Sequence, residues 1–156
     1  MATVCNTLGY GLPLTALTLV LAVLLLRQQQ RLLALGMLMT FGVRWSDVAV
    51  KAIVAEPRPS PTLIRAQEHL TDGSFPSGHV VGTAVVLGLL LIALPFLRMP
   101  GGLRIVAAAL SLLLIAGVGL SRVWVGVHWP SDVLGGYTYA ALFLLPAVSL
   151  SVCKSP

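Results

Sequence analysis

The sequence is short of charged residues. Lys, Arg, Asp and Glu make up 10% of its 156 residues, and hydrophobic residues make up 57%, whereas soluble domains carry about 25% charged residues. Uncharged apolar runs such as residues 12–26 would be exposed to water in a soluble protein of this size, and too few polar residues remain to cover them. The shortage of charge therefore argues against a soluble domain and predicts one membrane-embedded domain over residues 1–156.

Cysteine is nearly absent as well. Cys5 and Cys153 lie near opposite ends of the chain, and neither has the paired-Cys or Cys/His spacing of a zinc site. Residues 1–6 contain no Lys or Arg, and no small-residue cleavage site follows the first apolar run. A secretory signal peptide would have a positively charged start and a small-residue cleavage site, so we expect this run to be retained as a membrane span.

Basic residues outnumber acidic ones by ten to five, which gives a net charge of +5. They lie at the ends of apolar runs or beside the candidate site, without the basic stripe and interleaved aromatic residues of a nucleic-acid-binding surface. We therefore expect no nucleic-acid partner. The positive charge instead predicts an anionic substrate and a fixed orientation in the bilayer.

Five apolar segments are long enough to cross a membrane. A helix needs about 20 mostly apolar residues to span about 30 Å of hydrocarbon. The segments lie near residues 10–26, 32–54, 78–97, 103–121 and 131–152. The sequence thus predicts an all-α fold, a polytopic transmembrane helical bundle of about five spans.

The positions of basic residues predict the orientation of this bundle. In an alternating topology, the basic residues that flank the segments fall on one side of the membrane: Arg27, Arg31, Arg98, Arg104 and Lys154. Cytoplasmic loops carry an excess of Lys and Arg, so this side should be cytoplasmic. The N-terminus, the long polar stretch and the turn before the fifth segment then face outward.

The long polar stretch, Glu56–Ser77, must lie outside the hydrocarbon. Within it, Ile64–Leu70 could form a short surface helix. The stretch is either a solvated lid without chemistry or part of a functional site. His69 has no assigned role.

The first of three polar clusters begins at Lys51, near the outer end of the second segment, and is completed by Arg58-Pro59. Prolines around Arg58 stiffen the chain as it leaves the helix and fix the direction of the guanidinium group. Two cations would thus lie at one membrane surface. They either extend to the interface as isolated charges or bind an anion together.

The second cluster, Pro76-Ser77-Gly78-His79, lies where the polar stretch turns into the third segment. Proline suits the first turn of a helix, and the N–H groups and positive dipole end of a helix start form an anion site. Ser77 and Gly78 would supply the amides, and His79 follows in the same turn. By themselves, these four residues are a weak signal.

The third cluster runs from the end of the fourth segment to the start of the fifth and contains Ser121, Arg122, His128 and Asp132. If Pro130 begins the helix, Asp132 falls in its first turn and can reach back toward His128. A histidine oriented by a carboxylate is typical of a nucleophile or base. The alternative is an interfacial histidine among the tryptophans of an aromatic belt.

The predicted topology brings all three clusters to the outer ends of the second to fifth segments. Three cations, Lys51, Arg58 and Arg122, then gather with two histidines and one aspartate. This set suits phosphoryl transfer, in which cations stabilise the equatorial oxygens while one group attacks phosphorus and another protonates the leaving oxygen. The cations can do what a magnesium ion does elsewhere, so we expect no metal.

At these spacings the clusters resemble the three signature motifs of the type-2 phosphatidic acid phosphatase superfamily, matched in full over residues 51–132. The family includes soluble vanadium haloperoxidases, but so apolar a chain is similar to its membrane lipid phosphatases. The resemblance implies hydrolysis of a lipid phosphate or diphosphate, of the undecaprenyl pyrophosphate, phosphatidylglycerol phosphate or phosphatidic acid type, without a cofactor. The expected location is a bacterial inner membrane, with the active site facing the periplasm or exterior.

The resemblance also implies roles for single residues. His128 would attack phosphorus to form a phosphohistidine, Asp132 would hold and polarise its ring, and His79 would protonate the leaving lipid oxygen. The phosphoryl oxygens would be bound by Lys51, Arg58, Arg122, the backbone amides of Ser77 and Gly78, and Ser121. Water would then hydrolyse the phosphohistidine.

Two other functions stay open. A phosphotransferase of the same superfamily would pass the phosphoryl group to a second lipid. A non-catalytic member would keep the fold as a lipid-binding or assembly module, although such members should lose motif residues, and here all are present.

The sequence departs from the family in its number of spans. Membrane members usually have six, so five would leave one wall of the substrate groove to be closed by membrane lipid or by a second copy in a homo-oligomer. Arg44 and Asp47 also lie at membrane depth outside the motifs. We expect Asp47 to pair with Arg44 or Lys51 and so hold the lysine in place.

Overall fold

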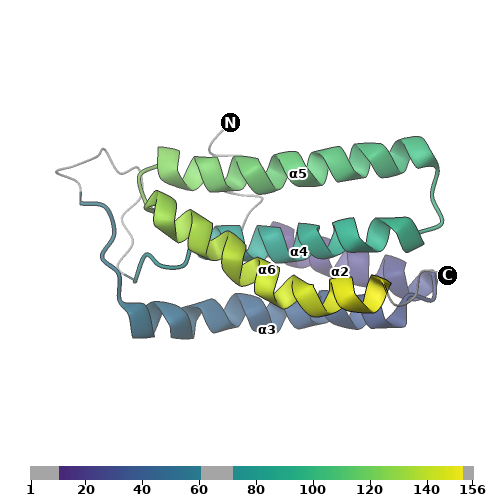
Figure 1. The fold of residues 1–156 in the computed structure, drawn as a ribbon, viewed down its shortest axis with the longest axis horizontal. Helices are drawn as coiled ribbons and strands as arrows, with labels where there is room; N and C mark the ends of the chain where they lie inside the picture. The colour runs from purple at the N-terminus through teal and green to yellow at the C-terminus, as the bar shows by residue number, and fades with distance from the viewer. Residues whose placement is uncertain (1–10, 61–71, 153–156) are drawn as a thin grey trace.

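The computed structural model describes residues 11–60 and 72–152, and Figure 1 shows the helices that they form. In chain order the helices are α2 (Leu12–Arg27), α3 (Arg31–Val54), α4 (Gly78–Ala93) continued by a 3-10 turn η1 (Leu94–Phe96), α5 (Gly101–Trp124) and α6 (Pro130–Val152). No strand occurs within the described ranges. The all-α prediction is confirmed, and each α-helix falls on one of the five predicted segments.

Among the described residues, four helical stretches are long and apolar enough to cross a membrane: Arg31–Val54, Gly78–Phe96, Gly101–Trp124 and Pro130–Ser149. Helix α2 is apolar but has 16 residues. At 1.5 Å per residue it is about 24 Å long, less than the hydrocarbon thickness of about 30 Å. The first predicted segment therefore forms a helix, and its crossing of the membrane stays a prediction. The helix predicted over Ile64–Leu70 lies outside the described residues.

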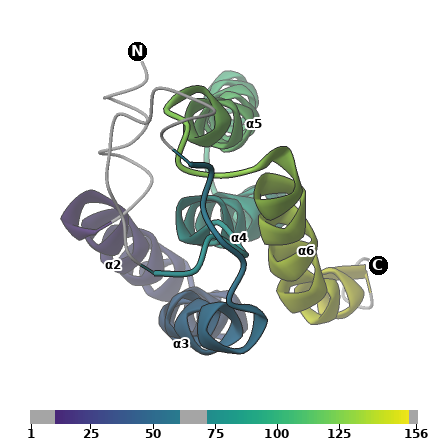
Figure 2. The same cartoon turned by 90° about the vertical axis from the view of Figure 1, so that its left-hand side faces the viewer.

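Helix α4 lies at the centre of the bundle, with α2, α3, α5 and α6 around it (Figure 2). Its spanning stretch is 61% buried, against 22%, 17% and 22% for the stretches in α3, α5 and α6. A helix that is apolar on all sides suits this central position. The outer helices expose large apolar side chains such as Trp45, Ile105 and Leu120, as expected of helices that contact lipid.

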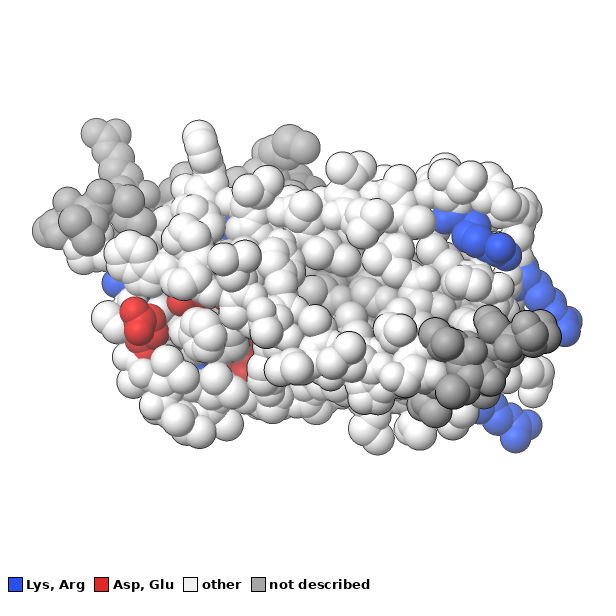
Figure 3. All heavy atoms as spheres, in the orientation of Figure 1, with Lys and Arg blue, Asp and Glu red and all other residues white. Residues whose placement is uncertain are grey.

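The two ends of the bundle differ in charge (Figure 3). Basic side chains gather at the right-hand end of that view, and acidic side chains lie toward the opposite end. The turns after α2 and after α4 meet at the basic end, where the Arg98 N–H donates to Gln28 Oε1 at 2.6 Å. This separation agrees with the alternating topology, and the side of the membrane that each end faces stays a prediction.

At the other end, α6 approaches α4 closely because Gly136 has no side chain. A Cβ atom there would lie 3.0 Å from Val80 Cβ and 3.2 Å from the Ser77 carbonyl oxygen. Val80 is almost fully buried, so it has little room to move. This contact fixes the start of α4, which carries the second cluster, against α6, which carries part of the third.

Candidate functional site

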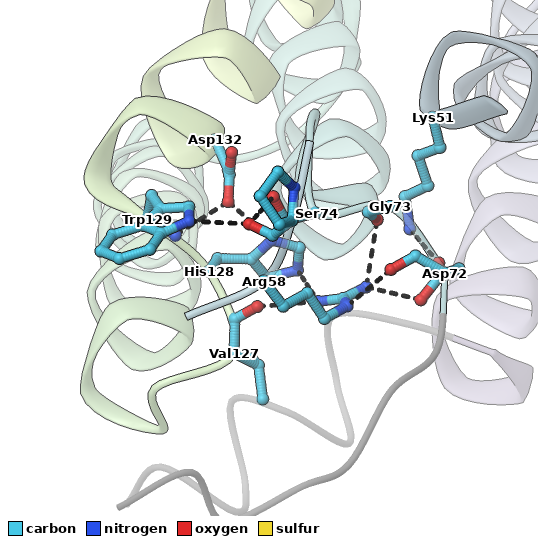
Figure 4. Close-up of polar contacts among 10 residues, drawn as sticks. Lys51, Arg58, Asp72, Gly73, Ser74, Val127, His128, Trp129 and Asp132 are labelled. Carbon is cyan, nitrogen blue, oxygen red and sulfur yellow. Dashed lines mark hydrogen bonds and ion pairs between the residues drawn. The ribbon is translucent and has the colours of Figure 1, made fainter. Parts of the chain in front are cut away.

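Three segments far apart in the sequence meet at the end of the bundle opposite the turns after α2 and after α4: the chain after α3, the residues before α4 and the turn between α5 and α6 (Figure 4). The Ser74 N–H donates to the Glu56 carbonyl at 2.9 Å. The Trp129 indole N–H donates to the Pro57 carbonyl, also at 2.9 Å. These bonds tie the segments to one another, so the three predicted clusters lie together.

Lys51 and Arg58 lie on either side of the end of α3. Lys51 is in the last turn of the helix, and Ala55 then turns the chain with a left-handed φ of 49°. Pro59 is buried and restricts the backbone of the residue before it. The Arg58 side chain is thereby directed toward the turn between α5 and α6 (Figure 4), where Nη1 donates to the Val127 carbonyl at 2.7 Å.

His128 and Asp132 form the pair that the sequence predicts. Pro130 begins α6, and Asp132 lies in the first turn. Its Oδ2 is 3.3 Å from His128 Nδ1 and accepts the Trp129 backbone N–H at 2.8 Å. His128 is 4% exposed and Asp132 0%, so the carboxylate holds the imidazole within the protein and away from bulk water.

The partners of the two ring nitrogens decide the tautomer of His128. Arg58 Nη1 lies 3.4 Å from Nε2, and a guanidinium group can only donate hydrogen bonds. Nε2 must therefore be the acceptor, and the proton of the neutral ring lies on Nδ1, facing the Asp132 carboxylate. The lone pair of Nε2 is thus directed toward the cations.

The environment of His128 keeps its ring neutral. Burial is the largest cause, and the charges of Arg58, Lys51, Arg122 and His79 add to it, so that the pKa of His128 is lowered to about 3. All these effects disfavour the imidazolium form. At neutral pH the ring therefore has a free electron pair, as a nucleophile requires.

Lys51 and Arg58 share a counter-ion that the sequence analysis did not consider. Asp72 Oδ2 lies 2.7 Å from Lys51 Nζ, and Oδ1 lies 2.7 Å from Arg58 Nη2. The expectation that Asp47 pairs with Arg44 or Lys51 stays a prediction: the lysine ammonium contacts Asp72, and the charges of Lys51 and Arg44 also act on Asp47. In the sequence, the only sign of this contact is an acidic residue, Asp72, shortly before the second cluster. Its partners are known only from the folded structure, in which the chain before α4 lies against the end of α3.

The start of α4 differs in two details from the prediction. Ser77 is the N-cap and Gly78 the first helical residue, so Pro76 precedes the cap rather than lying in the first turn. The Ser77 N–H donates to the Asp132 carbonyl at 3.1 Å, so this amide ties α4 to α6 and is not free for a phosphoryl oxygen. Ser77 Oγ is buried and makes no hydrogen bond within the described chain. The hydroxyl, and not the amide, is therefore the donor that Ser77 has left for a phosphoryl oxygen.

Helix α5 continues to Trp124, three residues beyond the predicted segment, so Ser121 and Arg122 lie in its last turn rather than in a loop. Arg122 is fully buried, and its charge acts on His128. Ser121 Oγ donates to the Val118 carbonyl at 2.7 Å, a bond within its own helix. A direct role of Ser121 toward a phosphoryl group stays a prediction.

The remaining predicted residues are His79, Gly78 and His69. His79 lies in the first turn of α4, half-buried, and its charge acts on His128. Gly78 is buried beside it, whereas His69 lies outside the described residues. No group of three or more His, Cys, Asp or Glu side chains that could hold a metal ion occurs in the part of the chain that the structure describes.

Comparison with known proteins identifies the family of the chain. The model of the PAP2 superfamily matches residues 29–153. The chain is 35% identical over 112 residues to phosphatidylglycerophosphatase B of Bacillus subtilis (strain 168), a match that covers 68% of this chain and 52% of that protein. It is 34% identical over 95 residues to undecaprenyl-diphosphatase BcrC of the same organism, covering 60% and 44%. The chain thus spans about half the length of these curated relatives.

A solved structure has the same fold. The crystal structure of a transmembrane PAP2 type phosphatidylglycerolphosphate phosphatase from Bacillus subtilis matches with a TM-score of 0.82 at 24% identity, covering 99% of this chain and 76% of that one. The predicted family and the predicted fold are thereby confirmed. The chain belongs to the PAP2 superfamily and is a multi-pass membrane protein.

Proposed function

We propose that the protein hydrolyses a lipid phosphate or diphosphate, with His128 as nucleophile and a phosphohistidine as intermediate. The observation that carries this proposal is the state of His128, whose unprotonated Nε2 faces Arg58 and the neighbouring cations. A neutral nitrogen beside fixed positive charge suits attack on an anionic phosphoryl group. The family, and two relatives named as lipid phosphatases, support the reaction class.

In the first step, His128 Nε2 attacks phosphorus, so that an N–P bond forms and the P–O bond to the lipid breaks. The three cations of the site stabilise the charge on the equatorial oxygens. His79 donates a proton to the leaving oxygen, which departs as the lipid alcohol, or as the lipid monophosphate if the substrate is a diphosphate. Asp132 accepts the Nδ1–H and stabilises the positive charge that the ring gains.

In the second step, water attacks the phosphorus of the phosphohistidine. The neutral His79 takes a proton from the water as the new P–O bond forms and the N–P bond breaks. Inorganic phosphate leaves, and both histidines return to their starting protonation states. A lipid alcohol in place of water would make the same intermediate serve a phosphotransferase.

A lipid substrate fits the position of the site. The cations and His128 lie at the end of a bundle of apolar helices, so a substrate can keep its tail in the bilayer while its phosphate enters the site. The arginine-rich opposite end should face the cytoplasm. We therefore place the reaction at the outer face of a bacterial inner membrane, on phosphatidylglycerol phosphate, undecaprenyl pyrophosphate or phosphatidic acid.

Phosphate release by the purified protein tests this proposal. The protein is incubated with each of these lipids, with and without an acceptor lipid, beside a His128→Ala variant. We expect release of inorganic phosphate from at least one lipid without an acceptor, and none from the variant. Turnover only with an acceptor would indicate a phosphotransferase, and equal release by His128→Ala would overturn the assignment of the nucleophile.

A further inference from the structure

Asp72 lies where an anion would bind between Lys51 and Arg58 (Figure 4). Each of its carboxylate oxygens is 2.7 Å from one of the two cations, and its carbonyl accepts Arg58 Nε–H at 3.0 Å. The Asp72 side chain is 52% exposed, whereas the side chains of Lys51 and Arg58 are 15% and 11% exposed. The carboxylate therefore covers the two cations on the side that faces solvent.

A phosphoryl group needs the same donors as this carboxylate. Both groups present negatively charged oxygens to the Arg58 guanidinium and the Lys51 ammonium. An open cavity of about 390 Å³ borders all three side chains, so a phosphoryl group could reach them from outside. The phosphoryl group could not bind both Lys51 and Arg58 while the Asp72 carboxylate forms ion pairs with them.

The charge of Asp72 makes the two ligands exclusive. Burial would raise the pKa of Asp72, but the hydrogen bonds and charges of Lys51 and Arg58 outweigh it and hold the pKa at about 2. The carboxylate is thus ionised throughout the neutral pH range. A phosphate or vanadate anion at the same cations would meet a like charge, which weakens its binding.

We propose that Asp72 is an internal competitor of the phosphoryl group: it holds Lys51 and Arg58 in place when the site is empty, and it withdraws when a phosphoryl group binds. The inference rests on the proposed function, which makes these two cations phosphoryl ligands. It also has a consequence for the nucleophile, because Arg58 Nη1 lies on the lone pair of His128 Nε2. For attack, Nη1 must leave Nε2, and this contact is separate from those that Arg58 Nη2 and Nε make with Asp72.

Vanadate binding tests the competition without turnover. Purified wild-type protein and variants are titrated with orthovanadate by calorimetry at neutral pH. Asp72→Asn keeps the shape of the side chain but no longer forms ion pairs with Lys51 and Arg58, so both cations are left for the anion, and we expect vanadate to bind about tenfold more tightly. Asp72→Glu keeps a competing carboxylate and should bind as weakly as wild type.

A matched control separates competition from general electrostatics. Glu56 is exposed, lines the same cavity and makes no ion pair with a described residue, so Glu56→Gln removes the same charge without freeing either cation. We expect a change smaller than twofold. Equal tightening by Glu56→Gln and Asp72→Asn, or by Asp72→Asn and Asp72→Glu, would overturn the competition.

Two further outcomes keep this inference apart from the proposed function. If Lys51→Gln weakens vanadate binding but Asp72→Asn leaves it unchanged or weaker, the cations bind phosphoryl groups and Asp72 does not compete with them. If Lys51→Gln has no effect on vanadate binding, the assignment of the phosphoryl ligands fails, and the inference about Asp72 fails with it. Tighter binding in Asp72→Asn alone supports both.

Discussion

At the scale of single residues, the ring of His128 is held between two neighbours. The Asp132 carboxylate accepts a hydrogen bond from Nδ1, the protonated ring nitrogen, and the Arg58 guanidinium group donates to Nε2. The first contact fixes the ring and the second, with burial, keeps it neutral. The cations that would stabilise a bound phosphoryl group therefore also keep His128 in the neutral form that the proposed attack requires, since they make protonation of the ring unfavourable.

This account predicts the titration of His128 in the substrate-free protein. The chain has three histidines, so nitrogen NMR of labelled protein, with His69→Gln and His79→Gln variants for assignment, can follow each ring. We expect the pKa of His128 to be about 3. It should rise in Arg58→Gln, because one positive charge fewer opposes protonation. A midpoint near the ordinary 6.5 in wild type would contradict the account.

The same pKa sets the pH dependence of stability. The pKa of His128 is lowered from 6.5 to about 3 on folding, so between these values the unfolded chain binds a proton that the folded protein does not. Stability should therefore fall as the pH drops from about 6.5 toward 3. Thermal unfolding in detergent should show a smaller fall in His128→Gln. An equal fall in both proteins would mean that this ring does not contribute.

Sequence patterns identified most of these residues and the pair of His128 with Asp132, but not the other contacts of the site. The sequence predicts that Lys51, Arg58, His128 and Asp132 lie together, because helices that alternate across the membrane place all four residues at the same end of the bundle. The contact between Asp72 and the two cations, and the use of the Ser77 amide by Asp132, depend on how two loops fold against each other. No periodicity or spacing in the sequence specifies such contacts.

At the scale of elements, the Trp129 indole helps Arg58 to hold the turn before α6 against the chain after α3. The Trp129 indole N–H donates to the Pro57 carbonyl next to Arg58. Trp129→Phe keeps the ring but removes a bond worth about 1 kcal/mol, so we expect about a fivefold loss of kcat/KM in phosphate release. Trp124→Phe is the matched control, because that side chain is 79% exposed at the end of α5. Equal losses in the two variants would contradict this role.

Close packing of α6 on α4 gives a second prediction at this scale. In Gly136→Ala the new methyl group meets Val80 at 3.0 Å and the Ser77 carbonyl at 3.2 Å, and such overpacking costs about 1–3 kcal/mol. Gly42→Ala is the control, since nothing lies within 4 Å of its added Cβ and alanine favours a helix. Thermal unfolding should occur at a lower temperature in Gly136→Ala only. An unchanged midpoint would mean that the helices can separate freely at this contact.

Hydropathy predicted the helices well, and their ends less well. Apolar runs define the spans because lipid leaves backbone polar groups no partner outside a helix. The end of α5 lies beyond residue 121 because Ser121 and Arg122 continue the helix into the polar site. A polar side chain at the end of an apolar run marks the edge of the hydrocarbon, and the helix itself does not have to stop there.

At the scale of the whole molecule, we expect the site to lie on the opposite side of the membrane from the arginines that flank the spans: Arg27, Arg31, Arg98 and Arg104. The positive-inside rule makes the arginine end cytoplasmic. Single cysteines at Glu56 or Gln29, both exposed, report the two ends when Cys5 and Cys153 are replaced by serine. An impermeant thiol reagent should label Glu56→Cys in intact cells, and Gln29→Cys only after permeabilisation. The reverse pattern would place the site in the cytoplasm.

The central claim is that His128 carries the phosphoryl group, and trapping of that group tests it most directly. The purified protein is mixed with a lipid phosphate labelled with radioactive phosphorus and denatured within the first turnovers. We predict a protein-bound label that is labile to acid and stable to base, that maps to the peptide containing His128 and that is absent from His128→Ala. A turning-over enzyme that yields no such label, or a label that persists in His128→Ala, would contradict the account.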